Sequence, residues 1–293
     1  EIARHTKSVA AGYDGNQWQL AAHAHTDNTV PAGQMPRHNM TTVLPDNTAL
    51  LVWTSTEQPG ALAAFAADSR DDAAFRRYIA PWVGKEAAFA LVEPYSPEMR
   101  DDQFWVCAVR DEALARKRLD EYGDNTGLLR RYEYQTFEVR QFLGRSLLEP
   151  LLSNGRQDFQ NPACVLLDGY AVFAASTSAL ELWLDKYIVS QTLSNLPDYL
   201  LLNKDRPDLS SRFLYLNTAY LPVLLKQVLS PNFSAPNTMD MQRAQQTGLL
   251  GCDLQQSRKG IWTSTLAHQT SSVAASSASI LWKKTLGGAA ITQ

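Results

Sequence analysis

The clearest pattern along the chain is an apolar strand that ends at small hydroxylated residues and is followed directly by an amphipathic helix. Residues 164–193 show it best, because two apolar runs, 165–167 and 170–174, are separated by Asp168-Gly169. This dipeptide tolerates the positive φ angles of a tight hairpin turn. Apolar residues then recur at the spacing of one helical face: Leu180, Trp183, Leu184, Tyr187 and Ile188. The stretch predicts a buried β-hairpin followed by a helix that lies on the sheet.

Small polar residues mark the start of this helix. Ser178 lies three residues before Glu181, which is the spacing of a capping box, where the serine oxygen accepts from an early helix N–H and the glutamate binds the N–H of the cap. Ser176 offers a second hydroxyl at the same boundary. We therefore interpret Ser176 and Ser178 as residues that begin a helix and not as nucleophiles.

The same unit recurs at three other places. Strands are predicted at 48–54, 103–109 and 212–216, and the helices that follow them at 61–67 with 71–79, at 111–122, and along Leu221, Leu224, Leu225, Val228 and Leu229. Asp111 is the expected cap of the helix at 111–122, whose charged outer face is typical of a solvated surface (Arg110, Arg116, Lys117 and Arg118). Further strands are predicted at 85–93, 132–140, 247–255, 260–268 and 279–286.

This order of elements predicts the α+β class, with largely antiparallel sheets, capped amphipathic helices on one face, and recurrent strand-to-helix units. The hairpin turn and the closing strands favour antiparallel pairing over a parallel α/β sheet. The weakly patterned stretch 143–160 is the best internal boundary. We expect residues 1–40 to form an N-terminal arm or strand, 41–155 a first α+β half, and 156–293 a second half ending in antiparallel strands.

Composition and charge exclude several classes of partner. A net charge of -3 from 27 basic and 30 acidic residues lacks the excess of positive charge that binds nucleic acid or an anionic membrane surface. A hydrophobic content of 45% and a charged content of 19% are typical of globular proteins. No run approaches the roughly 18 apolar residues of a membrane helix, so the sequence predicts no nucleic-acid partner and no transmembrane segment in this chain.

The three cysteines are Cys107, Cys164 and Cys252, each within an apolar run that reads as a strand. An odd number at wide spacing is no disulfide framework, and none of them forms a C-x-x-C pair. Their expected role is that of small buried apolar side chains. A bridge between Cys107 and Cys164, on neighbouring strands, is the alternative that the sequence leaves open.

The remaining motifs predict no catalytic, cofactor-binding or metal residues and no cofactor. His23-x-His25, with His38 and Asp27 downstream, could place two ligands on one face of a strand, but surface histidines fit this small polar segment better. The nucleophile elbow G-x-S-x-G, the S-x-x-K pair and the glycine-rich phosphate loops are absent. Seven tryptophans and eleven tyrosines could line a sugar or peptide groove, although their positions on apolar faces favour core packing.

Four segments together resemble a known family: PDNTALLVW at 45–53, LLDGYAVFAASTSALELWLDKY at 166–187, FLYLNTAYLPVLL at 213–225, and the ending DLQQSRKGIWTSTL with ILWKKTLGGAAITQ. They are similar to the N-terminal α+β region of uncharacterised bacterial cell-envelope proteins, classed as a domain of unknown function, that carry a C-terminal part like a β-propeller. The resemblance covers residues 44–293. It implies a periplasmic, lipoprotein-type or outer-surface location and a chain that continues into a further domain. It brings no active-site residues.

The function expected from these observations is a non-catalytic cell-envelope scaffold or interaction domain with a protein or glycan partner. The alternative is a carbohydrate- or peptide-binding module in which aromatic side chains line a groove. A hydrolase whose catalytic residues come from distant positions is the third hypothesis.

Overall fold

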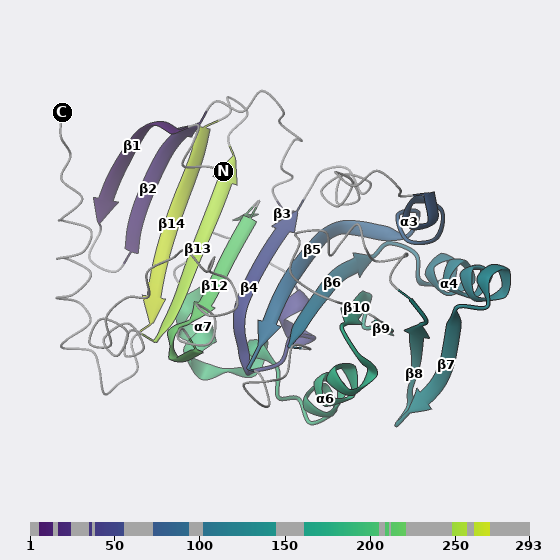
Figure 1. Cartoon of the computed structure of the whole chain (residues 1–293). Helices are drawn as coiled ribbons and strands as arrows, with labels where there is room; N and C mark the ends of the chain where they lie inside the picture. The colour runs from purple at the N-terminus through teal and green to yellow at the C-terminus, as the bar shows by residue number, and fades with distance from the viewer. Residues whose placement is uncertain are drawn as a thin grey trace, which may run out of the picture.

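The fold is seen in a computed structural model of the chain (Figure 1). It describes the backbone of residues 6–13, 17–24, 35–36, 39–55, 73–93, 102–144, 161–204, 209–210, 212–220, 248–256 and 261–269. Side chains are described for residues 40–55, 73–93, 102–144, 161–204, 212–220 and 248–253.

The described strands form one twelve-stranded sheet in the order β1-β2-β14-β13-β12-β4-β5-β6-β10-β9-β8-β7. Every neighbouring pair is antiparallel. The strands are β1 (Thr6–Tyr13), β2 (Gln17–Ala24), β4 (Thr48–Ser55), β5 (Val83–Val92), β6 (Gln103–Val109), β7 (Leu129–Tyr134), β8 (Phe137–Phe142), β9 (Ala163–Leu167), β10 (Tyr170–Ala174), β12 (Arg212–Asn217), β13 (Leu249–Gln256) and β14 (Ile261–Gln269). A separate pair joins β3 (Met35–Pro36) to β11 (Leu209–Ser210). The predicted α+β class with antiparallel pairing is confirmed.

The predicted hairpin at the centre of the chain is confirmed in its turn and its pairing. Leu167 of β9 lies opposite Tyr170 of β10, and the two residues between them have positive φ angles, 47° at Asp168 and 79° at Gly169. Two consecutive positive φ angles define the tight turn that twists in the same sense as its strands. β10 then pairs with β6 on its other side, which places the hairpin inside the sheet.

Helices cover both faces of the sheet, whereas the sequence pattern predicted helices on one face. The described helices are α3 (Ala73–Tyr78), α4 (Glu112–Thr126), α6 (Thr177–Ile188) and α7 (Pro197–Asn203), with short 3-10 turns η1 (Asn39–Thr42), η2 (Leu193–Asn195) and η3 (Thr218–Tyr220). One core cluster contains the buried side chains of α3 and α4, and we call that side of the sheet the α4 face. Another contains those of α6 and α7, and its side of the sheet is the α6 face.

The alternation along the central strands explains why two covers are needed. Val106 and Val172 point to the α6 face, while Cys107, Ala171 and Phe173 point to the α4 face. β9 and β10 are buried at every position. A strand that is apolar on both sides must be covered on both sides, so a strand-to-helix pattern in sequence does not by itself assign the face.

The residues that begin the helices are partly as predicted. Asp111 caps α4, its side chain accepting from the Leu114 N–H at 2.9 Å. For α6 the cap is Ser176, which accepts from the Ala179 N–H at 3.1 Å. The capping box of Ser178 with Glu181 is wrong, because Ser178 lies in the first turn, exposed, and Glu181 instead accepts from the Tyr132 hydroxyl.

Strands of all three predicted segments lie in the same sheet, since β1 and β2 precede residue 40, β4 to β8 lie within 41–155, and β9 to β14 lie within 156–293. The division into two halves stays a prediction. The expected helices at 61–67 and 221–229 and the strand at 279–286 lie outside the described residues.

Candidate functional site

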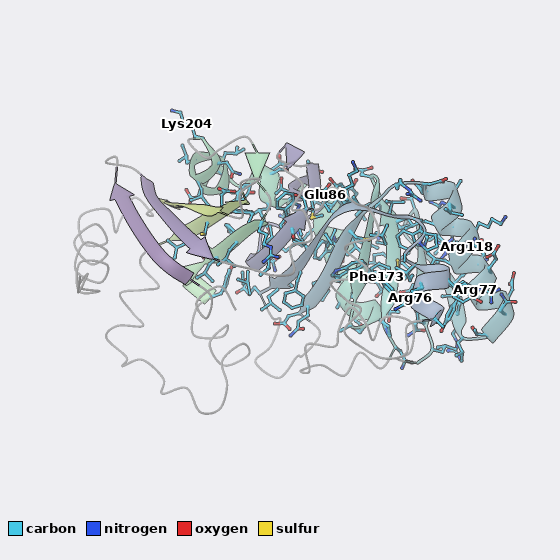
Figure 2. All side chains as sticks on the ribbon, turned by 90° about the horizontal axis from the view of Figure 1, so that it is seen from above. Arg76, Arg77, Glu86, Arg118, Phe173 and Lys204 are labelled. Carbon is cyan, nitrogen blue, oxygen red and sulfur yellow. The ribbon has the colours of Figure 1, made fainter. Side chains whose placement is uncertain are left out.

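A buried carboxylate lies on the α6 face of the sheet. Glu86 of β5 is 6% exposed and accepts from two aromatic side chains, Trp53 Nε1 at 2.9 Å and the Tyr170 hydroxyl at 3.1 Å. Figure 2 shows Glu86 within the body of the sheet, in contrast to Lys204, which projects away from α7. The group connects β4, β5 and β10, because Trp53 and Tyr170 lie 33 and 84 residues from Glu86 in the sequence.

An irregularity in β5 lies beside this carboxylate. The register between β5 and β6 shifts between Val83 and Ala87, and a Cβ atom at Gly84 would lie 2.8 Å from the Ala108 Cβ atom. Only glycine allows the backbone of β5 to approach β6 so closely at this point. This close approach explains why position 84, two residues before Glu86, is a glycine.

The electrostatics of this cluster favour a structural role. Burial, together with the neighbouring Glu86 carboxylate, raises the pKa of Tyr170 well above its usual range, so the phenol keeps its proton and donates a hydrogen bond to the carboxylate. Both oxygens of Glu86 have donors, and a hydrogen bond to a charged acceptor is stronger than a neutral one. The arrangement fixes three strands relative to one another and does not activate Tyr170 as a base.

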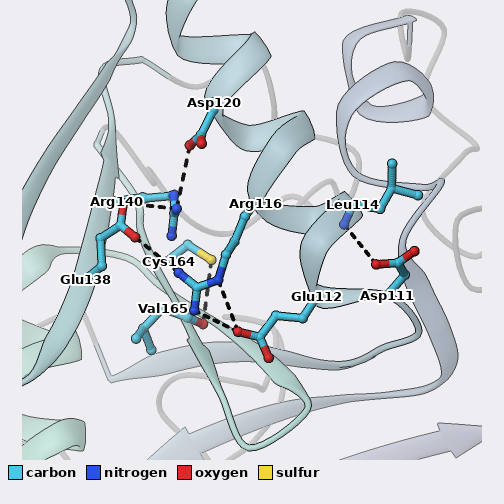
Figure 3. A network of polar contacts seen from close by, with 9 residues as sticks. All are labelled: Asp111, Glu112, Leu114, Arg116, Asp120, Glu138, Arg140, Cys164 and Val165. Atoms are coloured by element: carbon cyan, nitrogen blue, oxygen red, sulfur yellow. Dashed lines mark hydrogen bonds and ion pairs between the residues drawn. The ribbon is translucent and has the colours of Figure 1, made fainter.

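A second polar network lies on the α4 face, between α4 and the β7-β8 hairpin (Figure 3). Arg140 of β8 is 2% exposed, and its Nη2 atom lies 2.9 Å from Glu138 Oε1 and 3.6 Å from Asp120 Oδ1. Glu138 also pairs with Arg116 at 3.1 Å, and Asp120 with Arg131 at 3.1 Å. The charges alternate, so the buried guanidinium is neutralised by two half-exposed carboxylates. Among the described residues, Nε and Nη1 of Arg140 have no hydrogen-bond partner.

Tyrosine–carboxylate contacts attach α6 to the strands beside it. The Tyr132 and Tyr134 hydroxyls of β7 donate to Glu181 and Asp185 of α6, at 3.0 Å and 2.8 Å. Burial, with the Glu181 hydrogen bond, raises the pKa of Tyr132 to about 12. The contacts hold the β7-β8 hairpin against the helix, which explains the acidic side of α6.

The described tryptophans belong to the core. Trp53, Trp82 and Trp183 are buried, and Trp105 is half-buried against Phe173. Trp183 packs on Phe104 with 4.4 Å between ring centroids. The prediction that aromatic side chains pack in the core is confirmed for these four, and the side chains of the other tryptophans lie outside the described part.

Among the described residues, the large apolar side chains that are exposed are aliphatic. Leu200 and Leu201, adjacent on α7, are 56% and 53% exposed. The other large apolar side chains exposed among the described residues are also aliphatic: Val52, Leu128, Ile188, Val189 and Leu214. Single exposed apolar residues are ordinary, but neighbouring ones mark candidate contact surfaces.

The residues discussed as candidates from sequence are not brought together. The His23 side chain, and His25, Asp27 and His38 entirely, lie outside what the structure describes. In the described part, no group of three His, Cys, Asp or Glu side chains is placed to hold a metal ion, and no helix is long and apolar enough to cross a membrane.

Cys107 and Cys164 are free thiols, and the bridge between them is excluded. β10 lies between the strands of Cys107 and Cys164, and two strand spacings of about 4.8 Å each exceed the Cα separation of about 7 Å that a disulfide spans. Both thiols are buried as predicted, whereas Cys252 is only partly buried. Burial raises the pKa of Cys107 and that of Cys164, the latter to about 12. Such thiols are unreactive.

Sequence reasoning missed Glu86 and Arg140. A signal existed for Glu86, a charged residue within a strand pattern that is otherwise apolar on its face, whereas Arg140 shares its face of the strand with Glu138 and reads as an ordinary surface position. What the sequence did not show is the set of distant partners, Trp53, Tyr170 and Asp120.

Comparisons with known proteins give a family and weak likenesses to solved structures. A family model described as "Protein of unknown function (DUF3352)" matches residues 62–285. No curated protein matches. Among solved structures, crystal form III of TP0453 aligns with a TM-score of 0.45 and 9% identity over 87% of each chain. Crystal form I of TP0453 aligns with a TM-score of 0.43 and 8% identity over 86% of each, and likenesses of this degree carry no conclusion about the present chain.

Proposed function

Because this chain belongs to the family of unknown function DUF3352, we propose a function from its own surface: a non-catalytic scaffold or interaction domain that binds another protein. The observation that carries the proposal is the pair of exposed leucines on α7, Leu200 and Leu201. α7 is held in place by its other side, where Tyr199 and Leu202 are buried and Tyr199 packs on Tyr215 with 5.5 Å between ring centroids.

The exposed pair has a contact energy of useful size. Full burial of a leucine side chain is worth about 1.5–3 kcal/mol. Each of these two is already about half covered, so we expect about 1–1.5 kcal/mol from each when a partner covers it. A partner that covers both side chains therefore gains about 2–3 kcal/mol of contact energy.

A protein partner fits this surface better than a glycan. Sugar-binding grooves present the flat faces of tryptophan and tyrosine, whereas the described tryptophans are buried or half-buried. The exposed groups are aliphatic, which suits the apolar side chains of a protein. A carbohydrate- or peptide-binding module is the second candidate, and retention on peptidoglycan or on a glycan array would favour it.

A hydrolase is the third candidate. The buried acid Glu86 accepts hydrogen bonds from two donors inside the core, which fits a structural role. Turnover in a screen of ester, glycoside and peptide substrates would replace the proposal with this candidate.

We place the domain in the cell envelope as part of the same proposal. Its support is the resemblance of the four sequence segments to envelope proteins. The unknown-function class that those segments indicated is confirmed by the family match, while the envelope location and the C-terminal propeller stay predictions. Fractionation and protease accessibility of the full-length gene product in cells would test the location, and a product found only in the cytoplasm would contradict it.

The experiment compares three forms of the chain as bait for envelope extract. Wild type and Lys204→Ser, a change at an exposed residue of the same region, are expected to retain the same proteins in the same amounts. Leu200→Ser/Leu201→Ser is expected to retain at least about tenfold less of a specific partner, because about 2 kcal/mol of contact is lost. Equal retention by all three forms would contradict the proposal.

A further inference from the structure

The strand β7 is an end strand of the sheet. Among the described strands it pairs with β8 alone, and Figure 1 shows it at the outer side of the sheet, beyond β8. Arg130, Arg131 and Glu133 on this strand are exposed. An end strand carries a row of backbone N–H and C=O groups that can pair with another chain.

The hairpin register identifies which backbone groups point outward. β7 and β8 are joined by the two residues Gln135 and Thr136, and Tyr134 lies opposite Phe137. In such a hairpin the closing pair is hydrogen-bonded, and pairs then alternate along the ladder. The Leu143 N–H donates to the Leu128 carbonyl at 2.8 Å, which fits this alternation. It follows that the even-numbered residues of β7 bind β8, while Leu129, Arg131 and Glu133 direct their N–H and C=O groups to the open edge.

The charges on the open edge are self-complementary. A second copy that continues the sheet through a two-fold axis perpendicular to it runs antiparallel and keeps each side chain on its own face. With Tyr132 on the axis, Arg131 of each copy lies opposite Glu133 of the other, in the pairs whose backbone groups point outward. Oppositely charged residues directly across a strand pair attract. A shift to the neighbouring allowed register places Arg131 opposite Arg131, which repels.

We infer that a second copy of this chain docks on the β7 edge, antiparallel and centred on Tyr132. Charged residues on an end strand often serve only to prevent pairing. Residues of a single sign would do that in every register, whereas the arginine and glutamate of β7 select one. Arg131 is held beside the edge by its ion pair with Asp120 of α4, at 3.1 Å. The inference rests on this edge and not on the surface of α7.

Charge reversal with rescue tests the pairing. Sedimentation velocity over a wide concentration range is expected to give a reversible dimer for wild type. Glu133→Arg is expected to raise the Kd of the dimer about tenfold or more, because two attractive pairs become repulsive. Arg131→Glu/Glu133→Arg restores opposite charges and is expected to recover the dimer to within a few-fold. Urea unfolding of each variant checks that the fold is kept.

A disulfide trap tests the register itself. Tyr132→Cys places a thiol opposite its own copy in a non-hydrogen-bonded pair, where the Cα atoms are about 4.5 Å apart, so mild oxidation is expected to give a covalent dimer. Arg130→Cys, on the same face but opposite Tyr134 of the other copy, is the matched control and is expected to stay monomeric under the same oxidant. A wild type that remains monomeric at all concentrations, or equal cross-linking of the two variants, would overturn the inference.

Discussion

Removal of the Glu86 acceptor tests whether the buried carboxylate stabilises the sheet. Glu86→Met fills most of the volume but removes the acceptor that lies 2.9 Å from Trp53 Nε1 and 3.1 Å from the Tyr170 hydroxyl in the native chain. A buried unpaired donor costs about 1–3 kcal/mol, so we expect a loss of about 2–4 kcal/mol in the free energy of unfolding. Glu86→Ala adds a cavity and is expected to cost about 3–5 kcal/mol.

The effect of Tyr170→Phe on the free energy of unfolding is expected to change sign when Glu86 is replaced. Tyr170→Phe alone removes one donor from the carboxylate and is expected to destabilise by about 1–2 kcal/mol. In the Glu86→Met background the same change removes an unpaired hydroxyl, so it is expected to stabilise by about 1 kcal/mol. Urea unfolding followed by far-UV circular dichroism and tryptophan fluorescence measures both. If Tyr170→Phe has the same effect in both backgrounds, the two side chains do not act through this contact.

Three further predictions concern single groups. Ser176→Ala is expected to destabilise by about 1 kcal/mol because the Ala179 N–H loses its acceptor, while exposed Ser178→Ala changes stability by less than about 0.5 kcal/mol; equal effects in urea unfolding would contradict the assignment of the cap. Because the pKa of Tyr132 is raised to about 12 from about 10 in the unfolded chain, the unfolded state loses this proton first and stability falls as pH rises between these values. Tyr132→Phe should make that fall, followed by urea midpoints at constant ionic strength, less steep; an unchanged slope would refute it. In a chain whose third cysteine is replaced by serine, Cys107 and Cys164 should react with Ellman's reagent only when the chain opens, so a labelling rate that does not rise with urea would count against their burial.

Local signals in the sequence predicted local structure well. The Asp168-Gly169 turn, the strand at 103–109 and the Asp111 cap were all found where the pattern placed them. Each depends on residues close together in the chain, whose preferred backbone angles and hydrogen bonds act without help from the rest of the fold. The cap of α6 was displaced by two residues, because three hydroxylated residues in succession, Ser176 to Ser178, all fit a helix start.

These local signals did not predict the order of the strands in the sheet. Cys107 and Cys164 lie on strands that read as neighbours, but the strand of Tyr170 to Ala174 pairs with both and separates them. Which strands become neighbours depends on contacts between distant segments, and so does the face that each helix covers. An apolar residue at every position of a strand signals burial on both sides without saying which helix supplies each cover.

The partners of the buried polar residues could not be predicted from the sequence either, because they lie far away along the chain. Glu86 is visible in the sequence as an acid within an apolar strand, and that alone is compatible with a surface residue at the strand end. Its role depends on Trp53, 33 residues away, and Tyr170, 84 residues away. Likewise, Leu200 and Leu201 lie within the apolar run Tyr199 to Leu202, and the sequence of this run does not show that Tyr199 and Leu202 are the buried members.

The most direct test of the interaction-domain proposal is site-specific photo-crosslinking of the full-length gene product in living cells. A photoreactive amino acid is introduced at Leu200, at Leu201 and, as the control, at exposed Lys117 of α4, outside the proposed contact surface. The proposal predicts the same discrete protein adduct from the two leucine positions and its absence from the lysine position. The same adducts from all three positions, or none from Leu200 and Leu201, would contradict it.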